Sequence, residues 1–311
     1  MPKISIARLV EDNGTKLKLS WVNNHDSPAL LDSVAIAASP KGLIGHLNFI
    51  HPNWIQILGS QETDYVNALD DETRRQALAG LIDSGPACIV CAAGQTPPAP
   101  LLAACREHRI PLLSSPLPSL EVMGILRYYL ARLLAEPVSM HGVFLDVLGM
   151  GVLITGDAGA GKSELALELI SRGHGLIADD IVELYRIAPD TLEGRCPPML
   201  KDFLEVRGLG VLNIRTIFGE TAIRPKKNLK LVVNLEKPGG NLSLERLPLN
   251  ASVLEIAGVE IRKVTIPVAA GRNLAVLVEA AVRNFVLQLR GIDSTQEFID
   301  RHHQHMNNNG N

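Results

Sequence analysis

Cysteine is scarce in this chain, which has four cysteines among its 311 residues. So few thiols in a chain of this length indicate reduced cysteines in the cytoplasm rather than a disulfide framework. Long apolar segments are also missing, because Asp146 and several glycines interrupt the longest apolar stretch, around residues 143–155. A membrane-spanning helix needs about 18 apolar residues in a row, and Glu11 and Asp12 interrupt any apolar signal segment. We therefore expect a soluble, cytoplasmic protein with no membrane partner.

Net charge is small as well, since 30 lysines and arginines oppose 33 aspartates and glutamates, a formal charge of −3. This balance creates no global attraction for nucleic acid, so we expect no nucleic-acid partner. Hydrophobic residues make up 46% of the chain and charged residues 20%, which excludes disorder and a fibrous fold. At roughly 150 residues per domain, the length predicts two domains.

Strand and helix signals alternate along the first third of the chain. Strands are predicted at residues 4–10, 54–58, 87–93 and 110–113. Helical spacing is found at residues 61–82 and 101–108. This alternation predicts an open α/β domain with a partly parallel sheet.

A strong amphipathic helix begins near Pro118 and is stopped by Pro137. Its predicted buried stripe is Leu120, Met123, Leu126, Leu130, Leu133 and Leu134. We place a domain boundary after this helix. The prediction is an N-terminal α/β domain of unknown ligand at 1–136 and a second domain at 137–311.

The strongest motif is a phosphate-binding loop that matches G-x-x-x-x-G-K-[ST] completely. It reads Gly156, Asp157, Ala158, Gly159, Ala160, Gly161, Lys162 and Ser163. An apolar strand precedes it at 152–155 and a helix follows at 164–170, which is the required context. Glycines let backbone N–H groups close on a phosphate, Lys162 reaches the β- and γ-phosphates, and the Ser163 hydroxyl binds Mg²⁺. The motif therefore predicts a nucleotide phosphate and Mg²⁺ as ligands.

Two carboxylates, Asp179 and Asp180, end the next apolar run, 17 and 18 residues after Lys162. Beside Mg²⁺ and phosphate, one of them is suited to be a metal ligand or a general base, whereas the alternative is a solvated turn. The short spacing argues against a generic GTPase or motor ATPase and favours a compact, unusual P-loop kinase.

Two further segments have both a structural and a functional interpretation. Residues 204–214 place Glu205 and Arg207 before the closely spaced Gly208 and Gly210, a pattern that also suits a turn with a surface ion pair. Residues 266–273 form a Pro/Gly loop that leads into a helix, which Asn273 is suited to cap. An ordinary capped loop is the alternative there.

A fifth segment, Ser139-Met140-His141-Gly142, completes a set that occurs in one order: 139–142, 156–163, 172–180, 205–210 and 266–274. Together they resemble bacterial HPr kinase/phosphorylase, over about 139–285. The resemblance implies a bifunctional enzyme. It would use ATP to phosphorylate a serine of the phosphocarrier protein HPr, and would remove that phosphate with inorganic phosphate, releasing pyrophosphate. It also implies a catalytic domain resembling phosphoenolpyruvate carboxykinase, a homohexamer, and a role in carbon metabolism.

The resemblance also assigns residues. It places His141, Lys162, Asp180 and Arg246 in catalysis, with Asp180 taking the serine proton, and Ser163 and Glu205 on Mg²⁺. A stretch used in both reactions includes Leu204, Glu205, Val206, Arg207, Gly208, Leu209 and Gly210. A loop tied to dephosphorylation comprises Pro267, Val268, Ala269, Ala270, Gly271 and Arg272. Ala269-Ala270 stands where many members have Arg-Pro, so one cation is missing from this loop and the reverse reaction is supported by fewer matching residues than the kinase reaction.

Other interpretations compete with this one. Cys88 and Cys91 form a C-x-x-C pattern within a predicted strand, where they point to opposite faces and do not chelate a metal. Another P-loop phosphotransferase would have the same loop and act on a small metabolite. A nucleotide-gated regulatory module would hydrolyse ATP slowly and work by binding partners.

Overall fold

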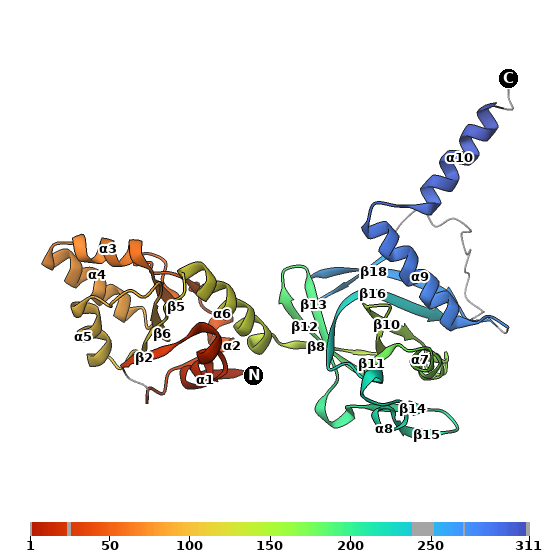
Figure 1. Ribbon diagram of the computed structural model, residues 1–311, viewed down its shortest axis with the longest axis horizontal. Coiled ribbons are helices and arrows are strands. Elements are labelled where there is room, and N and C mark those ends of the chain that lie inside the picture. Colours follow the sequence, from red (N-terminus) through yellow and green to blue (C-terminus); the bar gives the residue numbers. More distant parts are fainter. Residues whose placement is uncertain (1, 24–25, 238–251, 270, 309–311) are drawn as a thin grey trace. The chain divides into compact units, whose positions relative to one another are not determined.

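The computed structural model describes residues 2–23, 26–237, 252–269 and 271–308, with side chains as far as Arg301. The chain divides into two compact units, Met1–Glu136 and Pro137–Asn311 (Figure 1). In these described ranges, no helix combines the length and the apolar character that a bilayer span requires.

A five-stranded sheet forms the centre of the first unit, in the order β2-β7-β6-β5-β4. Its strands are β2 (Ser20–Asn23), β4 (Gly42–His46), β5 (Asn53–Leu58), β6 (Cys88–Cys91) and β7 (Leu112–Ser114). The pairs from β4 to β7 are parallel, and β2 is antiparallel at one edge. Separately, β1 (Lys3–Ser5) pairs with β3 (Leu30–Asp32). The predicted open α/β domain with a partly parallel sheet is therefore confirmed.

Helices cover both faces of this sheet. They are α1 (Ile6–Leu17), α2 (Ser33–Ala37), α3 (Ser60–Ala68), α4 (Asp71–Asp83), α5 (Ala99–Glu107) and α6 (Ser119–Leu134). One face packs against α1 and α6, and the other against α4 and α5. Cys88 belongs to the first core and Cys91 to the second, as expected for residues on opposite faces of a strand. Burial raises the pKa of both thiols to about 12.

Helical spacing at 61–82 is confirmed, as two helices, since Asp70 caps a new one at α4. Two other sequence-based predictions in this unit are wrong. Residues 4–10 are mostly helical, because Ser5 caps α1 by accepting a hydrogen bond from the Arg8 N–H at 3.2 Å. Leu120 is 75% exposed, because the buried face of α6 is centred on Val122, Leu126 and Leu130, and Leu120 is turned away from that face.

A nine-stranded sheet dominates the described part of the second unit, with β11-β9-β10-β16-β13-β12-β8 in order and β18 pairing with β16 and β17. The strands are β8 (Pro137–His141), β9 (Val143–Val147), β10 (Met150–Gly156), β11 (Gly175–Ala178), β12 (Ile181–Ala188), β13 (Thr191–Arg195), β16 (Lys226–Glu236), β17 (Ser252–Ile256) and β18 (Val259–Pro267). A hairpin of β14 (Phe203–Val206) and β15 (Gly210–Asn213) is separate.

Strand direction brings several loops to one edge of this sheet. β16 is parallel to both β10 and β18. β9 is antiparallel to both β10 and β11, so these two strands also run in the same direction. The carboxyl ends of β10, β11, β16 and β18 therefore lie along the same edge.

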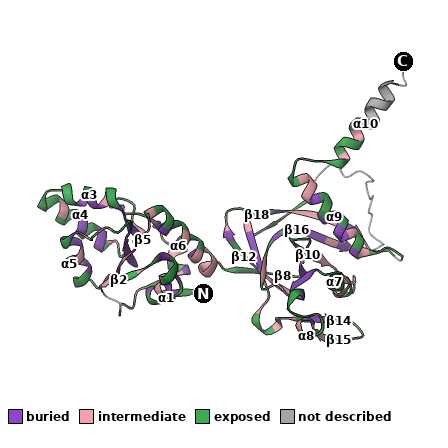
Figure 2. Ribbon diagram, viewed as in Figure 1, coloured by how far each residue is buried: buried purple, intermediate pink, exposed green. Residues whose placement is uncertain are grey.

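The helices of this unit are α7 (Lys162–Ser171), α8 (Ile214–Phe218), α9 (Leu274–Leu289) and α10 (Ser294–Asn308), with short 3-10 turns η1 (Pro198–Leu200) and η2 (Glu220–Ala222). α7 and α9 pack on one face of the sheet, against the buried residues of β9, β10 and β16 (Figure 2). A second core on the other face contains Phe144, whose ring occupies the space that a β-carbon on Gly194 would need. The mixed α/β, two-domain prediction thus holds for the whole chain.

Candidate active site

The phosphate-binding loop connects β10 to α7, so the strand and helix predicted on either side of it are present. Gly156 has a φ of +140°, and a β-carbon there would lie 2.4 Å from the Leu235 carbonyl oxygen on the neighbouring strand. Gly159 and Gly161 have φ angles of +72° and +87°. These backbone conformations favour glycine. The loop then opens directly into the positive N-terminal end of α7.

Three cationic side chains surround this loop. Lys162 Nζ donates hydrogen bonds to the carbonyl oxygens of Gly156 at 2.9 Å and Asp157 at 3.0 Å. Lys237 Nζ donates to the Ala158 carbonyl oxygen at 2.9 Å. A β-carbon placed on Gly159 would lie 3.6 Å from Lys237 Nζ and 3.8 Å from an Arg207 guanidinium nitrogen. The positive charge suits a polyphosphate. Lys237 lies outside all of the motifs found in the sequence.

The two adjacent aspartates lie in different environments. Asp179 is buried, and its Oδ2 accepts a hydrogen bond from the Glu205 N–H at 2.9 Å. Burial raises the pKa of Asp179 above its ordinary value, although that hydrogen bond acts in the opposite direction. Asp180 has a φ of +65° and a side chain that is 71% exposed. An exposed carboxylate at the carboxyl edge of the sheet is accessible to a substrate, whereas Asp179 is a structural tie.

His141 lies beside Asp180. The Nδ1 of His141 is 3.6 Å from Asp180 Oδ1, and the Gly142 N–H donates to the Asp180 carbonyl oxygen at 3.1 Å. The pairing of β8 with β12 sets this arrangement, because His141 is opposite Ile181 in the register. Two residues of the predicted catalytic set are therefore brought together.

Glu205 lies on the hairpin that Asp179 fastens. Along β14, Leu204 and Val206 are buried while Glu205 and Arg207 are exposed, which follows the alternation of a strand. β14 contacts α7, the helix that carries Ser163 in its first turn.

A hydroxyl and a carboxylate are suitable ligands for Mg²⁺. Mg²⁺ is usually held by one or two carboxylates together with substrate phosphates, and not by a full protein cage. No group of three or more His, Cys, Asp or Glu is placed to hold a metal within the described residues. The donor set of Ser163 and Glu205 fits the ion.

The loop after β18 lies at the same edge. Pro267 is opposite Glu236 in the register, and the Val268 N–H donates to the Glu236 carbonyl oxygen at 2.8 Å. Arg272 is exposed, just before Asn273 caps α9 by accepting the Val276 N–H at 3.0 Å. Arg246 and Ala270 lie outside the described residues, so their assignments stay predictions.

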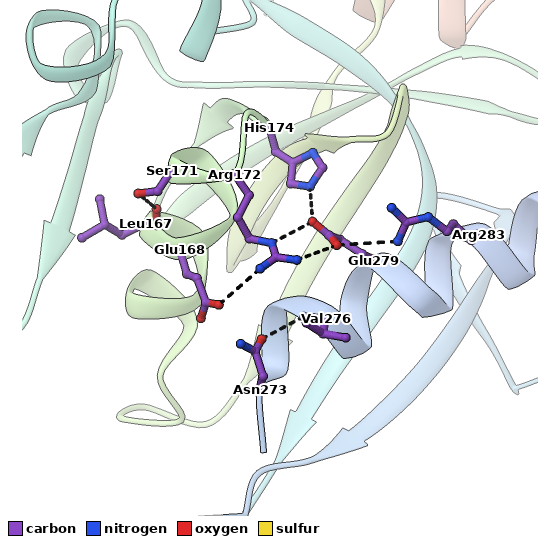
Figure 3. A network of polar contacts seen from close by, with 9 residues as sticks. All are labelled: Leu167, Glu168, Ser171, Arg172, His174, Asn273, Val276, Glu279 and Arg283. Carbon is purple, nitrogen blue, oxygen red and sulfur yellow. Dashed lines mark hydrogen bonds and ion pairs between the residues drawn. The ribbon is translucent and has the colours of Figure 1, made fainter. Parts of the chain in front are cut away.

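A polar cluster joins α7 to α9 behind the loops (Figure 3). Arg172 donates to both carboxylate oxygens of Glu279 at 2.9 Å, and His174 Nε2 lies 3.0 Å from Glu279 Oε1. These partners, Arg172 first, lower the pKa of Glu279 to about 2. The cluster gives His174 a structural role. The role of Glu279 was not predicted from the sequence. The only signal was a carboxylate on the apolar face of α9, which indicates a buried charge but not its partner.

Comparisons with known proteins cover nearly the whole chain. The model of the HPr Serine kinase N terminus matches residues 4–130, and that of the HPr Serine kinase C-terminal domain matches residues 132–302. A protein of Chromobacterium violaceum named HPr kinase/phosphorylase is 56% identical over 304 residues, covering 97% of this chain and 96% of that protein. One of Nitrosomonas europaea with the same name is 57% identical over 314 residues, covering 99% and 97%.

A solved structure, described as the Hpr(Ser) kinase/phosphatase from Coxiella burnetii, is 37% identical with a TM-score of 0.47, over 52% of this chain and 98% of that one. The two family models and the two highly similar relatives agree with the motif set found in the sequence. The chain belongs to the HPr kinase/phosphorylase family.

Proposed function

We propose that this protein transfers the γ-phosphoryl group of ATP to a serine of HPr and removes it again with inorganic phosphate, releasing pyrophosphate. The observation that carries the proposal is the exposed Asp180 carboxylate at the sheet edge where the phosphate-binding loop begins. β10 and β11 are separated by one strand, which corresponds to about 10 Å between their ends. A serine hydroxyl bound at Asp180 would therefore lie far enough from the loop to leave room for the phosphoryl group that is transferred.

Each residue has a defined task in this reaction. Asp180 accepts the proton of the serine hydroxyl as the oxygen attacks phosphorus, and His141 holds the Asp180 carboxylate in place. Lys162 and the N-terminal end of α7 stabilise the charge on the phosphate oxygens. Ser163 and Glu205 would hold Mg²⁺, which would supply charge neutralisation at the phosphates. Arg246 would add a further cation. A positioned base contributes about 10²–10⁴-fold in rate, or roughly 3–5 kcal/mol of barrier.

The reverse reaction uses the same groups in the opposite order. Asp180 returns its proton to the serine oxygen as that oxygen leaves phosphorus, and inorganic phosphate is the nucleophile. The residues 204–210 serve both directions, and the loop 267–272 serves phosphorolysis, in which Arg272 is the cation suited to bind the incoming phosphate.

An open site favours a protein substrate over a small metabolite. The side chains of His141 and Asp180 are 83% and 71% exposed. Large apolar residues on the nearby hairpin are exposed too, including Leu209 at 66% and Val211 at 65%. A folded protein partner can cover such a surface, whereas a metabolite of a few atoms cannot.

Further parts of the proposal concern the whole protein. We take 1–136 as a domain of unknown ligand and 137–311 as the catalytic domain, with a fold resembling phosphoenolpyruvate carboxykinase. The protein would act in the cytoplasm as a homohexamer that regulates carbon metabolism.

Incubation with γ-labelled ATP, Mg²⁺ and purified HPr tests the proposal, with Lys162→Ala as the inactive control. We expect label on a serine of HPr with wild-type protein, and its release as pyrophosphate when inorganic phosphate is added. Lys162→Ala should keep less than about a tenth of either activity, because both directions need the loop charge. Label on a small molecule would instead indicate a metabolite kinase, and free phosphate alone a regulatory ATPase.

A further inference from the structure

Lys237 contacts the phosphate-binding loop from a different part of the chain. It follows directly after β16, whose Leu235 is opposite Gly156 in the parallel pairing with β10. This register places Lys237 beside the loop at the carboxyl edge of the sheet. Its Nζ donates to the Ala158 carbonyl oxygen at 2.9 Å.

Two ammonium groups bind three consecutive carbonyl oxygens at the start of the loop. Lys162 binds those of Gly156 and Asp157, and Lys237 binds that of Ala158. In the proposed reaction Lys162 also has to contact phosphate oxygens, which competes with its hold on the loop. Lys237 is outside the motif, so its hydrogen bond to Ala158 is separate from the phosphate contacts proposed for Lys162.

The hydrogen bond to Ala158 fixes more than one oxygen atom. In a trans peptide the C=O and the N–H point in opposite directions, so holding the Ala158 oxygen also sets the direction of the Gly159 N–H. Gly159 has a φ of +72°, and a glycine reorients its peptide at little steric cost. The hydrogen bond from Lys237 therefore restricts the orientation of this peptide, which the glycine itself does not fix. Aligned N–H groups are what make such a loop bind anions.

We propose that Lys237 is a positioning residue of the nucleotide site: through the Ala158 carbonyl it keeps the Gly159 N–H oriented for a nucleotide phosphate. The inference rests on the proposed function, since it assigns the loop to ATP. Loss of Lys237 then weakens binding of ATP and ADP more than it slows transfer at saturating ATP. Arg207, which lies almost as close as Lys237 to the β-carbon position of Gly159, preserves positive charge near the loop in such a variant.

The test compares Lys237→Met, which keeps the apolar stem, with Lys237→Arg, which keeps a charged donor. Lys230→Met is the matched control, because Lys230 is an exposed lysine on the same strand, far from the carboxyl edge. The full-length variants are titrated with ATP and ADP in Mg²⁺ by calorimetry, and transfer to HPr gives kcat and KM. Thermal unfolding without nucleotide checks that each variant is folded.

We expect Lys237→Met to raise the Kd for ATP and ADP on the order of tenfold, as for loss of one charge-assisted hydrogen bond. Its kcat should stay within about threefold of wild type. This pattern is expected when the lost contact stabilised the ground state and the transition state equally. Lys237→Arg should restore most of the affinity, and Lys230→Met should match wild type.

An unchanged Kd in Lys237→Met would overturn the inference, and so would an arginine variant as weak as the methionine variant. A fall in kcat with an unchanged Kd would do the same, because Lys237 would then act on the chemistry. Wild-type protein that binds no ATP would contradict the proposed function itself, independently of any difference among the variants.

Discussion

The carboxylate of Asp179 accepts a hydrogen bond from the Glu205 N–H at 2.9 Å, which fastens the β14–β15 hairpin to the end of β11. Its neighbour Asp180 has an exposed carboxylate, with His141 Nδ1 3.6 Å away. Two consecutive residues of the same type therefore have separate tasks. Asp179 holds the hairpin that carries Glu205, the proposed metal ligand, whereas Asp180 is exposed and is the proposed base.

Asp180→Asn should slow both phosphorylation and phosphorolysis of HPr by a similar factor, on the order of 10²–10⁴. In the proposed mechanism one carboxylate is the base in one direction and the acid in the other, so microscopic reversibility links the two losses. Both rates are to be measured at saturating Mg²⁺ in one preparation. Asp179→Asn is the matched control and should cost less, since an amide oxygen still accepts the Glu205 N–H. Full phosphorolysis in Asp180→Asn without kinase activity would rule out a shared base.

Glu205→Gln should raise the Mg²⁺ concentration needed for half-maximal kinase activity. A neutral amide is a poorer ligand for a hard cation than a carboxylate. Activity measured against free Mg²⁺ at fixed ATP gives this value. Glu220→Gln, which changes a 76% exposed carboxylate, should leave it unchanged. If the Glu205 variant has the wild-type Mg²⁺ dependence, Glu205 is not a metal ligand.

Arg272→Ala should raise the phosphate concentration required for phosphorolysis on the order of tenfold, with a smaller effect on ATP-driven transfer. Arg272 is a cation at the start of α9, where an incoming phosphate is favoured. Arg290→Ala, an exposed arginine at the other end of the same helix, provides the control. Equal losses in both directions would argue against a specific role in phosphorolysis. If wild-type protein releases no pyrophosphate, the Ala269-Ala270 departure matters and the chain is a kinase only.

Glu279→Gln should lower the free energy of unfolding at pH 7 by about 1–3 kcal/mol, the range for hydrogen bonds to charged groups. The pKa of Glu279 is lowered from 4.5 to about 2 in the folded state, so the fold favours the ionised carboxylate. This contribution is complete above pH 4.5 and is lost as the pH falls toward 2. Urea unfolding between pH 7 and pH 3 should therefore show the gap to wild type becoming smaller.

The control for this series is Glu297→Gln, which removes an exposed pair with Arg301 on α10 and should cost little at any pH. A gap between wild type and Glu279→Gln that stays constant down to pH 3 would contradict the ionised pair.

Local patterns predicted much of this molecule correctly. The phosphate-binding loop lies between a strand and a helix, residues 54–58 are within β5, and Asn273 caps α9. Each of these depends on neighbours within a few positions of the chain. The family prediction also depended on short motifs in a fixed order, and the comparisons confirm it.

Long-range pairing determines what the patterns missed. Lys237 reaches the loop through the parallel pairing of β10 and β16, and Glu279 meets Arg172 because α7 and α9 pack on the same face. No local spacing encodes either contact. The strand predicted at 4–10 failed for a different reason, since Ile4 and Ile6 alternate as in a strand, whereas Ile6 and Leu9 have helical spacing and Ser5 caps the helix.

The Glu279 cluster joins α7 and α9 at unequal distances from their first residues. Arg172 lies about 15 Å along α7 from Lys162, whereas Glu279 lies about 8 Å along α9 from Leu274. Each helix begins at one of the two loops that the proposed function assigns to phosphate. The ion pair of Arg172 and Glu279 therefore links the C-terminal end of one of these helices to the second turn of the other.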